Sequence, residues 1–206
     1  MLEAAKFFVW TMCAVDFVCA AAATDEKDQI KRAVEAIKRL GAEIAVDENR
    51  EEKPVIVVNF SYTRIDDRAL AHLKSLRSIC ILNLSGTPIT DKGLVHIRSL
   101  PHLEALFLLG CRIGDEGLRN VRDLTCLETI SLGQTRITDK GLDALRALRK
   151  LRSLDLQDTK ISDAGLVHLK GLKSLRILYL GGTKVTKAGI EELQKALPRL
   201  VIVTKQ

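Results

Sequence analysis

The hydrophobic pattern of the chain changes near residue 54. Before it, residues 7–23 form an apolar run, and residues 28–40 place apolar side chains at helical spacing up to Gly41. After it, short apolar–variable–apolar triplets recur, which is the period-two pattern of a half-buried strand. The triplets are Leu82-Asn-Leu84, Leu106-Phe-Leu108, Ile130-Ser-Leu132, Leu154-Asp-Leu156 and Leu178-Tyr-Leu180. The pattern therefore predicts an amphipathic helix followed by a series of short strands.

Each triplet is followed by the same eight-residue motif. Thr87-Pro-Ile-Thr-Asp-Lys-Gly-Leu94, for example, recurs as Thr135-Arg-Ile-Thr-Asp-Lys-Gly-Leu142. The six copies begin at positions 63, 87, 111, 135, 159 and 183, a constant period of 24 residues. Such a period is typical of a solenoid, in which each repeat packs only against its neighbours.

The motif predicts its own local structure. Its first residue is Thr in five copies and Cys111 in the third, and we expect a buried ladder in which the hydroxyls satisfy backbone groups of the turn. We interpret Cys111 as a ladder residue rather than a reactive thiol. The second Thr or Ser is predicted to cap a short helix, with the following Asp near the positive end of that same helix. The glycine is expected where the helix passes close to a neighbour.

Each unit reads L-x-x-L-x-L-x-x-T-x-I, followed by T-D-x-G-L. In this pattern the chain resembles leucine-rich-repeat proteins, specifically the bacterial type with 24-residue repeats. The resemblance implies an α/β fold, a leucine-rich-repeat solenoid with a curved parallel β-sheet on the concave face and short helices on the convex face. We expect a helix–strand cap at its N-terminal end.

We expect three parts in the chain. Residues 1–23 are predicted to be a signal peptide, because Lys6 precedes an apolar run that ends in Ala21-Ala22-Ala23. Residues 24–53 are the N-terminal cap, with a strand at 43–46. Residues 54–206 are the leucine-rich-repeat domain, with six repeats and a closing C-terminal strand within 197–203. That last segment matches earlier repeats one residue out of phase.

If residues 1–23 direct export, the protein is expected to be a secreted, periplasmic or cell-envelope monomer. It would have no transmembrane anchor after the signal is removed. The alternative interpretation of residues 1–23 is an ordinary buried N-terminal helix, which would make the protein cytoplasmic.

The charge of the chain changes this picture little. The formal net charge is +6, but aromatic residues are only 4% of the chain, which argues against nucleic acid as a partner. One basic row follows the first motif position and is predicted to line an edge of the solenoid, at Arg64, Arg112, Arg136, Lys160 and Lys184. We expect neighbouring aspartates to compensate this row. An acidic partner or an anionic envelope polymer is the alternative.

The candidate binding residues lie on the outward face of the predicted strands. Phe107 and Tyr179 are prominent among them, because large aromatics on an exposed sheet are typical interface anchors. The predicted partner-binding residues are Asn83, Phe107, Ser131, Asp155, Gln157, Tyr179, Arg152 and Arg176.

The sequence offers few candidate catalytic or metal-binding residues beyond those that the repeat pattern explains. His72, His96 and His168 share one repeat position, but Asn120 and Ala144 interrupt the series, so we interpret them as solvated residues of the convex face. No Ser/His/Asp motif and no phosphate-binding glycine loop is present in the sequence. We therefore expect no catalytic residues, no metal and no cofactor.

The sequence predicts a non-catalytic scaffold that binds a protein, or alternatively a glycan, through the concave sheet. A second hypothesis is a structural or adhesive component of the cell envelope. A third is an adaptor similar to the F-box leucine-rich-repeat subunits of ubiquitin ligases, whose repeats also carry I-T-D-x-G-L.

Overall fold

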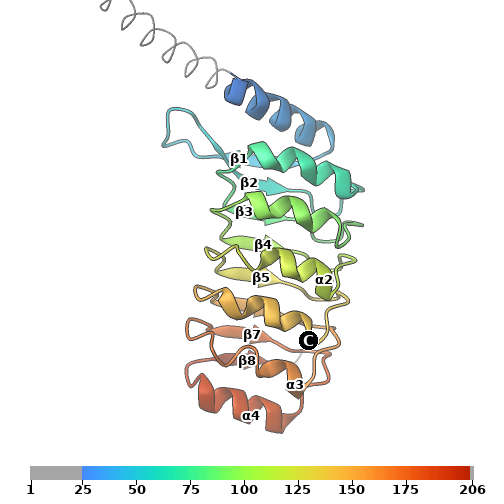
Figure 1. Ribbon diagram of the computed structural model, residues 1–206, viewed down its shortest axis with the longest axis vertical. Coiled ribbons are helices and arrows are strands. Elements are labelled where there is room, and N and C mark those ends of the chain that lie inside the picture. Colours follow the sequence, from blue (N-terminus) through green and yellow to red (C-terminus); the bar gives the residue numbers. More distant parts are fainter. Residues whose placement is uncertain (1–24, 205–206) are drawn as a thin grey trace, which may run out of the picture.

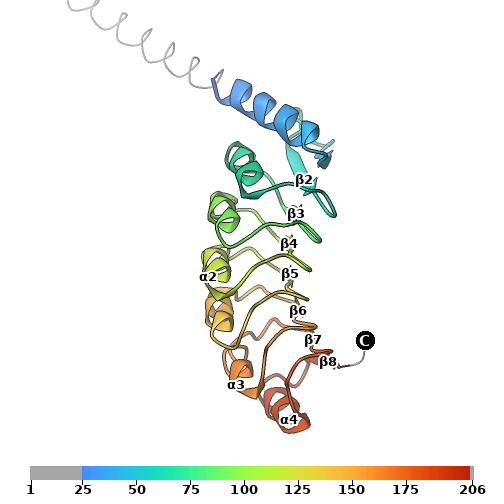
Figure 2. The same cartoon turned by 90° about the vertical axis from the view of Figure 1, so that its right-hand side faces the viewer.

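The computed structural model describes residues 25–204 as a curved stack of repeats. Strands line the concave side and helices the convex side (Figures 1 and 2). The strands form one eight-stranded sheet in chain order. They are β1 Glu43–Val46, β2 Val55–Asn59, β3 Ile81–Asn83, β4 Ala105–Phe107, β5 Thr129–Ser131, β6 Ser153–Asp155, β7 Ile177–Tyr179 and β8 Val201–Val203. The sheet and its helical cover confirm the predicted α/β solenoid.

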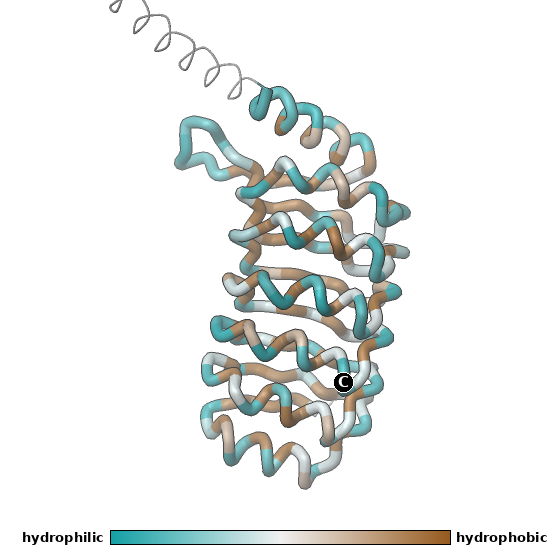
Figure 3. The backbone as a smooth tube through the Cα atoms, in the orientation of Figure 1, coloured by the Kyte–Doolittle hydropathy of each residue, from teal (hydrophilic) through white to brown (hydrophobic). Residues whose placement is uncertain are grey.

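The sheet register follows the period of the sequence. From β2 to β8 every neighbouring pair is parallel, and each residue lies opposite the one 24 positions later, as Leu82 does with Leu106. Equivalent leucines of successive repeats therefore stack into one continuous core. In Figure 3 the strand segments are brown, while the helix at residues 25–39 and the loop after β1 are largely teal.

The convex side consists mainly of 3₁₀ turns. The helical elements are η1 Asp67–Ser75, η2 Gly93–Ser99, α2 Asp115–Leu118, η3 Arg119–Val121, η4 Gly141–Ala147, α3 Asp163–Leu166 and α4 Lys187–Ala196. Neighbouring strands are about 4.8 Å apart, whereas packed helices need about 8–10 Å. Helices on one side of the sheet therefore spread apart, and this difference bends the stack around its strand side.

The last repeat returns to the common register. Leu197 and Leu200 lie one residue later than the 24-residue period requires, as the sequence predicts. The reason is the hydrogen bond that ends the helix: the Leu197 N–H donates to the Leu193 carbonyl, four residues back, whereas the Leu172 N–H donates to the Leu169 carbonyl, three residues back. The shift ends before β8, where Ile202 lies opposite Leu178. The predicted phase shift is therefore present at Leu197 and Leu200 but does not extend into the closing strand β8, which is in register.

A ladder of threonines runs through the turns after the strands. Each hydroxyl donates to the carbonyl three residues earlier at 2.6–2.7 Å, from Thr63, Thr87, Thr135, Thr159 and Thr183. Cys111 is buried in the same position, and its thiol donates to the Leu84 carbonyl of the preceding repeat at 3.0 Å. The ladder prediction is confirmed, including the buried position of Cys111.

A second ladder joins each repeat to the next through a carboxylate. Asp115 accepts from the backbone N–H of Thr138 at 2.8 Å and from its hydroxyl at 2.6 Å. The same pair of bonds joins Asp67 to Thr90, Asp139 to Ser162 and Asp163 to Thr186, while Asp91 accepts from the Gly114 N–H. These aspartates therefore also serve the helix start of the following repeat, a contact that the sequence did not predict. Asp163 lies in the first turn of its own helix α3, as expected.

The glycine of the motif makes room for this carboxylate. A Cβ at Gly93 would lie 2.6 Å from Asp67 Oδ1, and Gly117, Gly141, Gly165 and Gly189 are in the same relation to the aspartate of the repeat before. The close approach expected at these glycines is therefore present. In the motif T-D-x-G, the Asp of one repeat therefore packs against the Thr and the Gly of the next repeat.

The N-terminal end of the stack has a different construction. A helix over residues 25–39 packs Ala33 and Ile37 into the core, and β1 pairs antiparallel with β2. In the first repeat Asp66 takes the place of the second Thr and accepts from the Arg68 N–H, so it caps η1 itself.

Residues 1–24 and 205–206 lie outside the described residues, and so does the predicted signal peptide. Between residues 25 and 204 no helix is long and apolar enough to cross a membrane.

Candidate functional site

The outward side chains of the strands form the candidate binding surface on the concave face. Its central row consists of Asn59, Asn83, Phe107, Ser131, Asp155 and Tyr179, which the sheet register places side by side on successive strands. All six are half-buried, and each lies between two buried apolar residues that point into the core. The prediction that these positions face outward is therefore correct.

A second outward row lies two residues earlier on each strand. It consists of Val57, Ile81, Ala105, Thr129, Ser153, Ile177 and Val201. Ile81, Ile177 and Val201 are 37%, 36% and 59% exposed. These residues are not among those predicted from the sequence to bind a partner. The alternation that identified Asn83 also places Ile81 on the outward face.

The central row differs in polarity between its two ends. At the N-terminal end the Asn59 and Asn83 side chains accept from the amides of Ser61 and Ser85, each at 3.0 Å. At the C-terminal end Tyr179 lies beside Val203, and Ile177 lies beside Val201. We call Ile177, Tyr179, Val201 and Val203 the apolar cluster.

The predicted charged residues near the apolar cluster are held by the chain itself. Arg176 donates to the carbonyls of Lys173 and Leu175 at 2.8 and 3.0 Å, and Arg152 is 3.1 Å from Glu128 Oε2. A hollow of about 280 Å³ lies next to Arg176 and is also lined by Leu175, Leu197 and Pro198. A partner on the apolar cluster would therefore meet a positioned guanidinium at its border.

Asp155 is fixed by two hydrogen bonds on the concave face. Ser131 donates its hydroxyl to Asp155 Oδ2 at 2.8 Å, and the Gln157 N–H donates to Oδ1 at 3.0 Å. Gly133 is adjacent, and a Cβ there would lie 3.1 Å from Oδ2. The structure therefore brings together Ser131, Asp155 and Gln157, three of the predicted binding residues, in one pre-ordered polar group.

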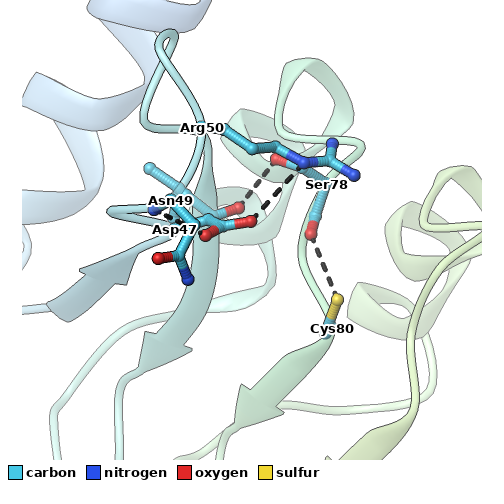
Figure 4. Close-up of polar contacts among 6 residues, drawn as sticks. Asp47, Asn49, Arg50, Ser78 and Cys80 are labelled. Atoms are coloured by element: carbon cyan, nitrogen blue, oxygen red, sulfur yellow. Dashed lines mark hydrogen bonds and ion pairs between the residues drawn. The ribbon is translucent and has the colours of Figure 1, made fainter.

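The thiols of Cys80 and Cys111 have raised pKa values and are therefore protonated at neutral pH. The loop between β1 and β2 lies beside Cys80, whose thiol is 3.5 Å from the Ser78 carbonyl (Figure 4). Partial burial and then the Glu104 carboxylate raise the pKa of the Cys80 thiol, although Arg50 opposes this. Burial also raises the pKa of Cys111. Both thiols are therefore weak nucleophiles at neutral pH.

The repeat-position histidines are less solvated than the sequence predicted. His72 is exposed, but His96 and His168 are half-buried, with Nδ1 atoms that are buried and have no hydrogen-bond partner. His168 Nδ1 is 3.6 Å from Asp143 Oδ1, beyond hydrogen-bond distance. No group of three His, Cys, Asp or Glu gathers as a metal site within residues 25–204.

We expect His96 to make the protein less stable in mild acid. Burial, and then Lys74, lower the pKa of His96 below the usual 6.5, although Asp67 opposes this. The unfolded chain then binds a proton that the folded chain resists, so the stability contribution is complete above pH 6.5 and is lost as the pH falls through the lowered folded pKa. Urea unfolding at pH 7.5, 6.5 and 5.5 would show a small decrease.

The chain itself suggests the matched substitution. Asn120 occupies the same repeat position and donates to the Gly117 carbonyl at 2.9 Å. His96→Asn should therefore reduce the acid sensitivity, whereas His72→Asn on the exposed side chain should not. An unchanged pH profile for His96→Asn would refute this assignment.

Stacked parallel strands with an open concave face define a class of solenoid proteins whose concave surface is available for binding. Two family models described as leucine rich repeat match the chain, one at residues 121–185 and the other at residues 69–97 and 99–121. This chain is a leucine-rich-repeat protein.

Two solved structures from Listeria monocytogenes are similar to the fold. The internalin inlF is 22% identical, with a TM-score of 0.60 over 72% of this chain and 47% of that chain. The internalin C2 is 18% identical, with a TM-score of 0.55 over 75% of this chain and 76% of that chain. This chain thus spans about half of the length of the first internalin. A comparison with curated proteins found no match.

Proposed function

We propose that the protein is a non-catalytic scaffold that binds a protein partner through its concave sheet. The observation that carries the proposal is the apolar cluster, in which Ile177 and Val201 are exposed and Tyr179 lies beside Val203 at the C-terminal end of the concave face. Solenoids commonly use this surface for recognition, and large apolar side chains with a polar border are the usual centre of a protein interface.

Phe107 extends the proposed surface toward the middle of the sheet. It lies between Asn83 and Ser131 in the sheet register, and the fixed group of Ser131, Asp155 and Gln157 separates it from the apolar cluster. Such an arrangement supplies aromatic anchors at two points, with positioned polar groups between them. Pre-ordered groups favour binding because less conformational entropy is lost.

We further propose that the protein acts outside the cytoplasm, as a secreted, periplasmic or envelope protein. The support is the signal-like sequence of residues 1–23, with Lys6 before the apolar run and Ala21-Ala22-Ala23 at its end. The division into signal, cap at 24–53 and repeat domain at 54–206 belongs to the same proposal.

The binding proposal predicts that Phe107→Ala and Tyr179→Ala each weaken capture of the partner at least tenfold. Truncation of an interface anchor typically costs about 2 kcal/mol or more. The measurement is quantitative affinity capture from cells that naturally produce the protein, with the wild type and each variant as bait. Thermal unfolding of each variant would verify that the fold is intact.

The convex face offers matched controls. Val95 and Val167 are 52% and 50% exposed and lie on the helical side, in the repeats that precede those of Phe107 and Tyr179. Val95→Ser and Val167→Ser should leave capture unchanged. Equal capture by the concave variants and the wild type would instead favour a structural or adhesive role, in which the array acts as a spacer.

A further inference from the structure

A row of cations follows the threonine ladder along one edge of the solenoid. Arg64, Arg112, Arg136, Lys160 and Lys184 are all exposed. Bridges pair Arg112 with Thr90, Lys160 with Thr138 and Lys184 with Ser162 across neighbouring repeats. The last four cations therefore come from consecutive repeats, about 4.8 Å apart along the stack. We call these five residues the basic edge.

The carboxylates near the basic edge are used elsewhere. The sequence favoured compensation by the motif aspartates, but Asp115 and its counterparts accept from the amide and hydroxyl of the next repeat. The ion pairs that the structure shows within residues 25–204 join cations outside the basic edge. The motif aspartates are thus already engaged by hydrogen bonds to the next repeat, and their compensation of the row stays a prediction.

The surroundings of the basic edge restrict what it can bind. The residues beside the cations are ladder threonines and isoleucines such as Ile113, Ile137 and Ile161, which are buried. The edge therefore presents charge without exposed apolar anchors, although a protein interface needs an apolar centre. Tyr62, 78% exposed, is at the far end beside Arg64, so no series of aromatics is available to stack nucleic-acid bases.

We propose that the basic edge binds a linear anionic polysaccharide, whose sulfate or carboxylate groups contact successive cations. Pro88 interrupts the basic edge after Arg64, but from Arg112 to Lys184 each repeat adds one cation at a constant interval. A chain with regularly spaced charges can follow these four repeats. Exposed Arg and Lys contact sulfates and carboxylates through charge-assisted hydrogen bonds. This surface is separate from the concave face, so a partner on the sheet and a polysaccharide on the edge do not compete for the same residues.

The test uses heparin fragments as the probe and the full chain as the protein. One variant replaces Arg112, Arg136, Lys160 and Lys184 by Gln. A matched variant replaces four exposed convex cations by Gln, namely Lys74, Arg98, Arg122 and Lys140, and so removes the same charge. Affinity is measured by titration calorimetry at two salt concentrations, with neutral dextran and polyglutamate as alternative ligands.

We expect the edge variant to lose at least tenfold in heparin affinity, while the convex variant retains most of it. Doubling the salt should weaken wild-type binding several-fold, since about four contacts release counterions. Equal losses in both variants would show that net charge alone is responsible and would overturn the proposal. So would the absence of heparin binding, or tighter binding of polyglutamate, which would indicate an acidic protein as the partner.

Discussion

Replacing Asp115 by Ala is expected to lower the free energy of unfolding by about 2–3 kcal/mol. The carboxylate accepts two hydrogen bonds from Thr138, and its removal leaves a partly buried amide and hydroxyl of the next repeat without an acceptor. Urea denaturation followed by circular dichroism measures the loss. Asp123→Ala on the exposed convex surface should change stability by less than about 0.5 kcal/mol.

A double-mutant cycle with Gly141 makes the test specific. A Cβ at Gly141 would overlap Asp115 Oδ1 and lie 3.1 Å from Ile137 Cγ2. Gly141→Ala should therefore destabilise the wild type by about 1–3 kcal/mol, the usual range for overpacking. In the Asp115→Ala background the carboxylate is gone, so the same substitution should have a much smaller effect. Strictly additive effects would show that the two residues do not interlock.

The second large effect is expected at Leu154 in β6. Its side chain is fully buried in the middle of the array, with Ile130 and Leu178 opposite it on the neighbouring strands. Leu154→Ala should lower the free energy of unfolding by about 2–5 kcal/mol, because it removes buried contacts and leaves a cavity. The measurement is again urea denaturation.

Ser153→Ala is the control for Leu154, since Ser153 is the preceding residue of the same strand and faces outward. It should change stability little. A loss at Leu154 no larger than at Ser153 would mean that the strand core does not support the central repeats. The comparison thus separates the two faces of a single strand.

The sequence predicted the strands well because their signal is local and repeated. The triplet Leu154-Asp-Leu156 specifies which side chains are buried, and the constant period of 24 specifies the register. The ladder position of Cys111 followed from the same alignment of repeats. These features depend only on residues within one repeat and on their copies.

Contacts between repeats were harder to predict. Asp139 stands beside its own helix in the sequence, but its partner Ser162 is 23 residues later, and only the stacked structure brings them together. Likewise, partial burial of His96 depends on how adjacent helices pack on the curved convex side. Of the candidate binding surface, the outward direction of Phe107 and Tyr179 could be predicted, whereas the apolar cluster requires the neighbouring strand β8 to be in register.

The carboxylate ladder gives the array a direction. Every motif aspartate reaches forward to the following repeat, and Asp66 starts the series by capping its own helix. A repeat that emerges from the ribosome thus meets a finished neighbour that already holds the acceptor for its first helical turn. Growth in the order of translation adds matched groups at each step, so the protein can be built vectorially from its N-terminal end.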